Sequence, residues 1–164
     1  RGRRYLEMVL GEVLNFLPIS EHIGSGGQPT AEQFSDIRTA GYEVVVNLAM
    51  PDSTNALPNE AELVRDRGME YVHIPVVWEA PKDDDLDRFF EIMDQNRLRK
   101  VFVHCVVNWR VSCFVYLYRV IELGVPVKVA EKSLLEIWRP NAVWHSFIKR
   151  SLTRYGVSDW ASRS

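Results

Sequence analysis

The sequence is poor in cysteine, since Cys105 and Cys113 are the only two among 164 residues. Two cysteines are too few for a disulfide framework, and free thiols favour a reducing compartment, which we expect to be the cytoplasm. The chain begins with Arg1 rather than methionine. Whether a further segment precedes Arg1, such as an export signal removed by processing, is therefore an open question.

Long apolar runs and a strong net charge are also missing. No apolar stretch reaches the roughly 18 residues of a membrane helix, so we expect no membrane span. The formal net charge is −2, and without a strong field we expect no nucleic acid among the partners. The composition is 46% hydrophobic and 26% charged, which predicts one globular domain over residues 1–164 with a core at about 20–155.

Short runs rich in valine alternate with helical patterns along the chain. We expect strands at residues 43–49, 70–77 and 100–104, and helices at about 5–17, 30–41, 59–68, 83 onward, 111–123, 128–138 and 141–155. Residues 25–29 (SGGQP) have the composition of a turn, and Thr30 with Gln33 predicts a capping box. The alternation predicts an α/β fold with a small, mostly parallel sheet flanked by helices.

The strand at residues 100–104 feeds a short loop that begins with Cys105 and leads into a helix. Backbone N–H groups of such a loop and of the helix N-terminus point the same way and form an anion site. The same dipoles stabilise a thiolate at Cys105, and Arg110 can add a bidentate contact to phosphate oxygens. A readily ionised thiol beneath a bound phosphoryl group is what covalent phosphoryl transfer requires.

The segment at residues 103–112 resembles the signature of protein tyrosine and dual-specificity phosphatases. With residues 25–30 (SGGQPT), 44–49 (VVVNLA) and 71–76 (YVHIPV), it is similar to a bacterial tyrosine-phosphatase-like group related to DUF442, over about residues 20–150. The resemblance implies the cysteine-phosphatase fold, a phosphorylated protein or small molecule as substrate, and no cofactor. It implies Cys105 as nucleophile and Ser112 as the hydroxyl that assists the leaving thiolate. We expect His104 to be a buried histidine that hydrogen-bonds and orients the loop, in preference to a base or a metal ligand. The implied phosphate-binding residues are Val106, Val107, Asn108, Trp109, Arg110 and Val111.

Two positions depart from the pattern of that family. Arg110 follows Cys105 after four residues instead of five, so Val111 stands where the arginine of the family is found. A helical step of about 100° is expected to turn the side chain of Arg110 away from the usual direction. Asn108 replaces a glycine in the middle of the loop; asparagine tolerates a positive φ, so the loop can still form.

The general acid is the least defined part of the predicted site. In the family an aspartate lies in the loop after the strand that corresponds to residues 71–76. Trp78 falls near that place in this chain, so Glu79 beside it is the candidate by position and chemistry. Asp83 and Asp84 are alternatives that helix capping explains equally well. The histidines show no ligand spacing, so we expect no metal site.

Three functions are compatible with these residues. The first is a phosphatase that forms a phosphocysteine intermediate at Cys105. The second is a phosphate-binding pseudoenzyme, which the displaced arginine and the uncertain acid favour. The third is a sulfurtransferase, because Cys105 and Arg110 at this spacing also resemble the rhodanese loop.

Overall fold

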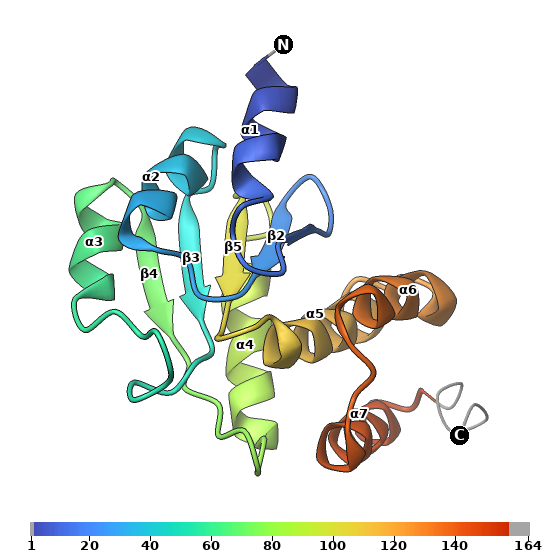
Figure 1. Ribbon diagram of the computed structural model, residues 1–164. Coiled ribbons are helices and arrows are strands. Elements are labelled where there is room, and N and C mark those ends of the chain that lie inside the picture. Colours follow the sequence, from blue (N-terminus) through green and yellow to red (C-terminus); the bar gives the residue numbers. More distant parts are fainter. Residues whose placement is uncertain (1, 158–164) are drawn as a thin grey trace.

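The computed structural model describes residues 2–157, which form a five-stranded sheet with helices on both faces (Figure 1). The elements in chain order are α1 (Gly2–Leu10), β1 (Leu17–Pro18), β2 (Ile23–Gly26), α2 (Ala31–Thr39), β3 (Val44–Asn47), α3 (Glu60–Asp66), β4 (Glu70–His73), α4 (Asp83–Gln95), β5 (Val101–His104), α5 (Trp109–Ile121), α6 (Val127–Ile137) and α7 (Ala142–Arg154). Within the described residues, no helix has the length and apolar character that crossing a bilayer requires.

The sheet is mostly parallel, with strand order β1-β2-β5-β3-β4. Only the short β1 is antiparallel to its neighbour among these strands. In the register of the central strands, His104 pairs with Gly26 of β2 and with Asn47 of β3. The carboxyl ends of β2, β5 and β3 therefore meet at one edge of the sheet. Cys105 is the first residue after β5 and lies at this edge. The predicted α/β fold is confirmed.

Hydrophobic side chains fill both faces of the sheet, as expected of parallel strands covered on two sides. On one face, Val46 and Val103 join a core formed with α4, α5, α6 and α7. On the other face, Val45 and Phe102 pack with residues of α1, α2 and α3. These four side chains are fully buried, and burying each stabilises the fold by roughly 1.5–3 kcal/mol. This packing holds the central strands in place, and it thereby sets the position at which the loop after β5 begins.

The N-terminal helix is shorter than predicted. The expected range of 5–17 is wrong, because α1 covers Gly2–Leu10. Gly11 follows the last helical residue, and Asn15 has a left-handed backbone with φ 50°. An α-helix does not accommodate that conformation. Residues 11–16 instead form turns that lead to β1.

The glycine-rich segment at residues 25–29 is partly a strand. The predicted turn is wrong for Ser25 and Gly26, which belong to β2. A Cβ at Gly27 would lie 2.6 Å from the carbonyl oxygen of Val106, so glycine there lets β2 approach the loop after β5 closely. The capping box predicted at the next helix is confirmed, since the Thr30 and Gln33 side chains each bond the backbone amide of the other residue.

Candidate active site

Cys105 lies at the bottom of a pocket at the carboxyl edge of the sheet. It is 1% exposed and directly follows β5. The pocket has a volume of about 250 Å³, and its walls come from the loop, the start of α5 and the turn after β4. The lining residues are Trp78, Cys105, Val106, Val107, Trp109 and Arg110.

The carbonyl groups of the loop point away from this pocket and are held by hydrogen bonds from outside the loop. The carbonyl oxygen of Cys105 lies 3.2 Å from Nδ1 of His104. The carbonyl of Val106 accepts from the Gln28 amide at 3.0 Å. The carbonyl of Val107 accepts from Nδ2 of Asn15 at 2.9 Å. Three successive peptide groups are therefore oriented by partners on neighbouring segments.

An isolated antiparallel bridge between Gly27 and Val107 joins the loop to the end of β2. Apart from that bridge, the amides of residues 106–111 have no backbone acceptor within the described part of the chain. The next amide, that of Ser112, begins the hydrogen bonds of α5 by donating to the Asn108 carbonyl at 2.9 Å. Successive N–H groups next to a helix N-terminus form a concave, positively polarised site for an anion. Cys105 stands at the base of this site.

Asn108 determines the shape of the loop. Its backbone is left-handed, with φ 70°, and it is the N-cap residue of α5. Its Nδ2 group donates to the carbonyl oxygen of Asn15 at 2.8 Å and to Oγ of Ser25 at 3.1 Å. Asn15 in turn donates to Val107, so the two asparagines clamp the loop to the segment before β1. The Asn108 side chain binds the protein scaffold behind the loop.

Substitutions of Asn108 separate the backbone conformation from the clamp. Asn108→Gly keeps the left-handed φ and removes two hydrogen bonds, so we expect the free energy of unfolding to fall by about 2 kcal/mol. Asn108→Ala adds backbone strain, and we expect it to lose about 1 kcal/mol more. Urea unfolding of the three proteins measures both steps. Equal stability of the wild type and Asn108→Gly would contradict the clamp.

Arg110 reaches the pocket although it stands one position earlier in the sequence than the arginine of the family pattern. The side chain is 7% exposed, and its Nη1 donates to the carbonyl oxygen of Val76 at 2.9 Å. Its guanidinium carbon lies 5.9 Å from the centre of the Trp78 ring. α5 begins at Trp109, which places Arg110 in its first turn and among the residues that line the pocket. Val111 is fully buried in the core and does not line the pocket.

Ser112 has hydrogen-bond partners other than Cys105, and Glu79 does not line the pocket. The Ser112 hydroxyl donates to the Trp109 carbonyl at 2.8 Å and accepts from Nε1 of Trp138 at 3.0 Å. Its single proton is thus directed to the backbone. Glu79 is exposed in the turn after Trp78 and is not among the lining residues. In the described part of the chain, no carboxylate lines this pocket and no three ligand side chains gather to hold a metal.

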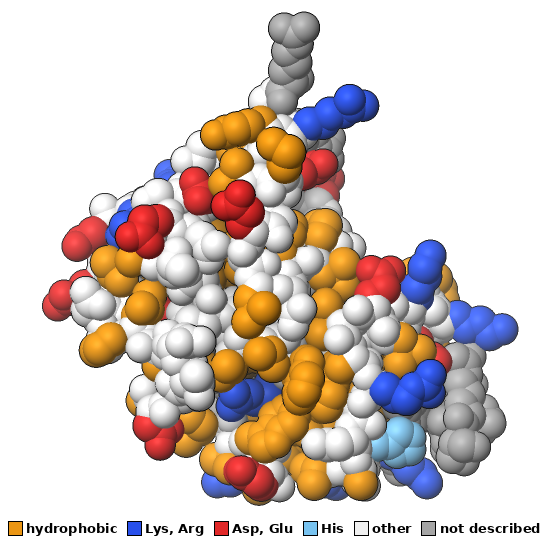
Figure 2. Space-filling view, in the orientation of Figure 1, with side chains coloured by type: hydrophobic (Ala, Val, Ile, Leu, Met, Phe, Trp, Pro, Cys, Tyr) orange, Lys and Arg blue, Asp and Glu red, His pale blue; other side chains and the backbone are white. Residues whose placement is uncertain are grey.

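Trp78 and Trp109 line the pocket and pack in a cluster with Trp138 and Trp144. Trp109 and Trp138 stack with ring centres 4.9 Å apart and planes 2° from parallel. The ring centre of Trp78 lies 5.8 Å from that of Trp109 and 5.7 Å from that of Trp144. Trp109 is 38% exposed, and hydrophobic side chains gather near the beginning of α5 on the face shown in Figure 2. An aromatic group in the pocket can pack against these rings.

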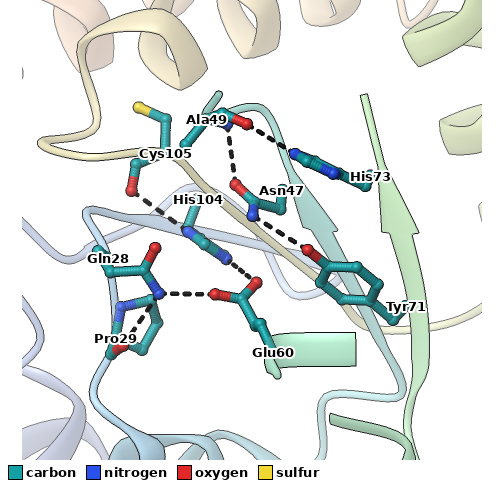
Figure 3. A network of polar contacts seen from close by, with 9 residues as sticks. All are labelled: Gln28, Pro29, Asn47, Ala49, Glu60, Tyr71, His73, His104 and Cys105. Carbon is teal, nitrogen blue, oxygen red and sulfur yellow. Dashed lines mark hydrogen bonds and ion pairs between the residues drawn. The ribbon is translucent and has the colours of Figure 1, made fainter. Parts of the chain in front are cut away.

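A buried polar network lies behind the loop, and no residue spacing in the sequence indicates it. Nε2 of His104 is 2.7 Å from Oε2 of Glu60, whose Oε1 accepts from Gln28 at 2.7 Å (Figure 3). Burial would raise the pKa of Glu60, but the charge of His104 and hydrogen bonds from His104, Gln28 and Tyr71 outweigh it and lower that pKa. An acidic residue at a helix start is usually explained by the helix dipole, so Glu60 does not stand out in the sequence.

The comparisons with known proteins agree with this architecture. A family model described as DSP-PTPase phosphatase fused to NAD+ kinase matches residues 20–142. The crystal structure of a DUF442 protein from Shewanella putrefaciens CN-32 matches with a TM-score of 0.82 at 33% identity, over 91% of this chain and 98% of that one. Tk-PTP in its active form has the same fold, with a TM-score of 0.69 at 17% identity, over 86% of this chain and 95% of that one.

A curated relative is much longer than the region that matches. The beta-lactamase hydrolase-like protein of Xylella fastidiosa is 27% identical over 113 residues, which are 66% of this chain and 26% of that protein. The matched region therefore spans about a quarter of that relative.

Proposed function

Because the chain belongs to the DSP-PTPase phosphatase family, we propose that it hydrolyses a phosphate monoester through a phosphocysteine intermediate at Cys105. The observation that carries the proposal is the loop after Cys105, which lines the same pocket as Cys105 and runs into the N-terminus of α5. Apart from the bridge between Gly27 and Val107, the amides of residues 106–111 have no backbone acceptor in the described part of the chain. Arg110 lines the same pocket and supplies the positive charge that a dianionic phosphoryl group requires.

The proposed reaction has two steps. The Cys105 thiolate attacks phosphorus, the S–P bond forms, and the P–O bond to the leaving group breaks. The loop amides and Arg110 bind the equatorial oxygens, on which charge develops in the transition state. Water then attacks phosphorus, the S–P bond breaks, and inorganic phosphate leaves with the thiolate restored.

Glu79 remains the candidate for protonating the leaving oxygen, because its turn adjoins Trp78 in the pocket wall. In that role Glu79 reaches the substrate only when the turn closes over the pocket. Ser112 assists the second step after its hydroxyl rotates from the Trp109 carbonyl toward the sulfur. The apolar walls around one cation favour a single phosphoryl group carried on an aromatic ring.

Trapping the intermediate tests the proposal. The protein is mixed with p-nitrophenyl phosphate, denatured within milliseconds, digested with trypsin and analysed by mass spectrometry. Cleavage after Arg110 separates the peptide with Cys105 from the peptide with Cys113, which serves as an internal control. We expect phosphoryl label on Cys105 alone. Release of nitrophenol with no label on Cys105 would contradict the phosphocysteine mechanism.

A rhodanese-like sulfurtransferase is the second candidate, and the length of the loop favours it. Four residues separate Cys105 from Arg110, and a smaller ring of N–H groups suits a persulfide. In that reaction the thiolate takes the outer sulfur of thiosulfate, the S–S bond of thiosulfate breaks and sulfite leaves. Cyanide then removes this sulfur as thiocyanate and restores the thiolate.

Two colorimetric assays distinguish the candidates. Nitrophenol release without thiocyanate formation supports the phosphatase and rejects the sulfurtransferase. Thiocyanate formation without nitrophenol release supports the sulfurtransferase and rejects the phosphatase. Tight binding of phosphate with neither product would make the protein a phosphate-binding pseudoenzyme.

A further inference from the structure

The His104 ring is held by oxygen atoms at both of its nitrogens. Nδ1 lies 3.2 Å from the carbonyl oxygen of Cys105, and Nε2 lies 2.7 Å from Oε2 of Glu60. A carbonyl and a carboxylate only accept hydrogen bonds, whereas a neutral imidazole has a single N–H group. Both contacts are hydrogen bonds only when the ring carries two protons and a positive charge.

Both partners of this ion pair are buried. His104 is 0% exposed and Glu60 is 4% exposed, so neither charge is stable there without the other. Oε1 of Glu60 also accepts from Gln28, which suits an ionised carboxylate. With its pKa lowered by these neighbours, Glu60 keeps its negative charge at neutral pH.

Among the described residues, Tyr71, Arg110 and Cys113 are the ionisable neighbours of the pair and the sulfur, and none of them carries a negative charge. Burial raises the pKa of Tyr71 to about 12, so the phenol facing Glu60 from β4 stays neutral. On α5, Arg110 lines the pocket as a cation. Burial also raises the pKa of Cys113, which therefore remains a thiol.

We propose that Glu60 is a positioning residue that keeps His104 doubly protonated and thereby favours the thiolate of Cys105. The His104 ring lies between Glu60 and the backbone of Cys105 (Figure 3). The positive charge is thus on the residue bonded to Cys105, and the negative charge lies behind it. The Nδ1–H group also holds the Cys105 carbonyl away from the pocket. This proposal rests on the proposed function only in taking Cys105 as the reactive residue.

Glu60→Gln tests the proposal because glutamine has the shape of glutamate without its charge. The amide of the new side chain can donate to Nε2 of a neutral His104, whose Nδ1–H still reaches the Cys105 carbonyl. The geometry is kept and the buried positive charge is lost. We expect the pKa of the Cys105 thiol to rise by about one unit. The pH dependence of alkylation by iodoacetamide measures this pKa without requiring turnover.

Glu62→Gln is the matched control. Glu62 lies on the same helix, α3, and is exposed, so its loss changes the net charge equally but leaves His104 paired. We expect the thiol pKa of this variant to equal that of the wild type. An unchanged pKa in Glu60→Gln, or an equal rise in Glu62→Gln, would overturn the proposal.

His104→Asn gives the same test should Glu60→Gln fail to fold. The Asn side chain keeps an N–H group near the position of Nδ1 and removes the ring charge. We expect the same rise in the thiol pKa, and no rise would overturn the proposal. Because alkylation is measured apart from catalysis, a failure of the proposed phosphatase reaction is seen separately, as absence of nitrophenol release.

Discussion

Cys105→Ser is expected to lower kcat/KM for p-nitrophenyl phosphate by about 10³-fold or more. A serine hydroxyl does not ionise near neutral pH, so it cannot supply the nucleophile that a thiolate supplies. The proposed anion site consists of backbone amides and does not depend on the sulfur. The variant is therefore expected to bind phosphate while turnover is lost, which calorimetry and the colorimetric assay measure on one sample.

Cys113→Ala is the matched control for this experiment. Cys113 is fully buried in the core and does not line the pocket. We expect its kcat/KM to stay within about twofold of the wild type, with a modest loss of stability from the smaller side chain. If Cys105→Ser kept most of the activity, the assignment of the nucleophile would be wrong.

Arg110→Lys is expected to lower kcat/KM by about 10²-fold, as when one oxyanion donor is removed from an enzyme. Lysine keeps the positive charge but lacks the planar fork that binds two phosphate oxygens at once. The contacts of Arg110 with the Val76 carbonyl and the Trp78 ring hold that fork at the pocket. Steady-state kinetics, together with a melting curve to confirm folding, measure the effect.

Arg119→Lys controls for the loss of a guanidinium from the same helix. Arg119 is half-buried on α5 and donates to Ser133, away from the pocket. We expect its kcat/KM to be unchanged within about twofold. Equal kinetics for Arg110→Lys and the wild type would mean that Arg110 has only the structural role its contact with Val76 suggests.

The sequence predicted the parts of the fold that depend on local patterns. Buried parallel strands require runs of apolar residues, which made β3 and β5 visible. The capping box at Thr30 is a contact between residues three positions apart, so spacing alone reveals it. β2 was missed because its glycines carry no hydrophobic signal; Gly24 leaves room for the Tyr42 side chain, and Gly26 leaves room for Phe102.

The sequence predicted most of the residues that line the pocket, but it did not predict the contacts that hold the loop in place. The clamp between Asn15 and Asn108 joins residues 93 positions apart, and the pair of His104 and Glu60 joins residues 44 apart. No periodicity marks such contacts, because they exist only once the sheet has brought its strand ends together. The same reason explains Arg110, whose direction depends on where α5 begins and not on its distance from Cys105 alone.

The crystal structure of the protein with orthovanadate tests the central claim most directly. We expect vanadium bonded to the sulfur of Cys105, with its equatorial oxygens about 2.7–3.2 Å from amides of residues 106–111 and from the Arg110 guanidinium. Vanadate bound elsewhere, or loop amides turned away from it, would contradict the account.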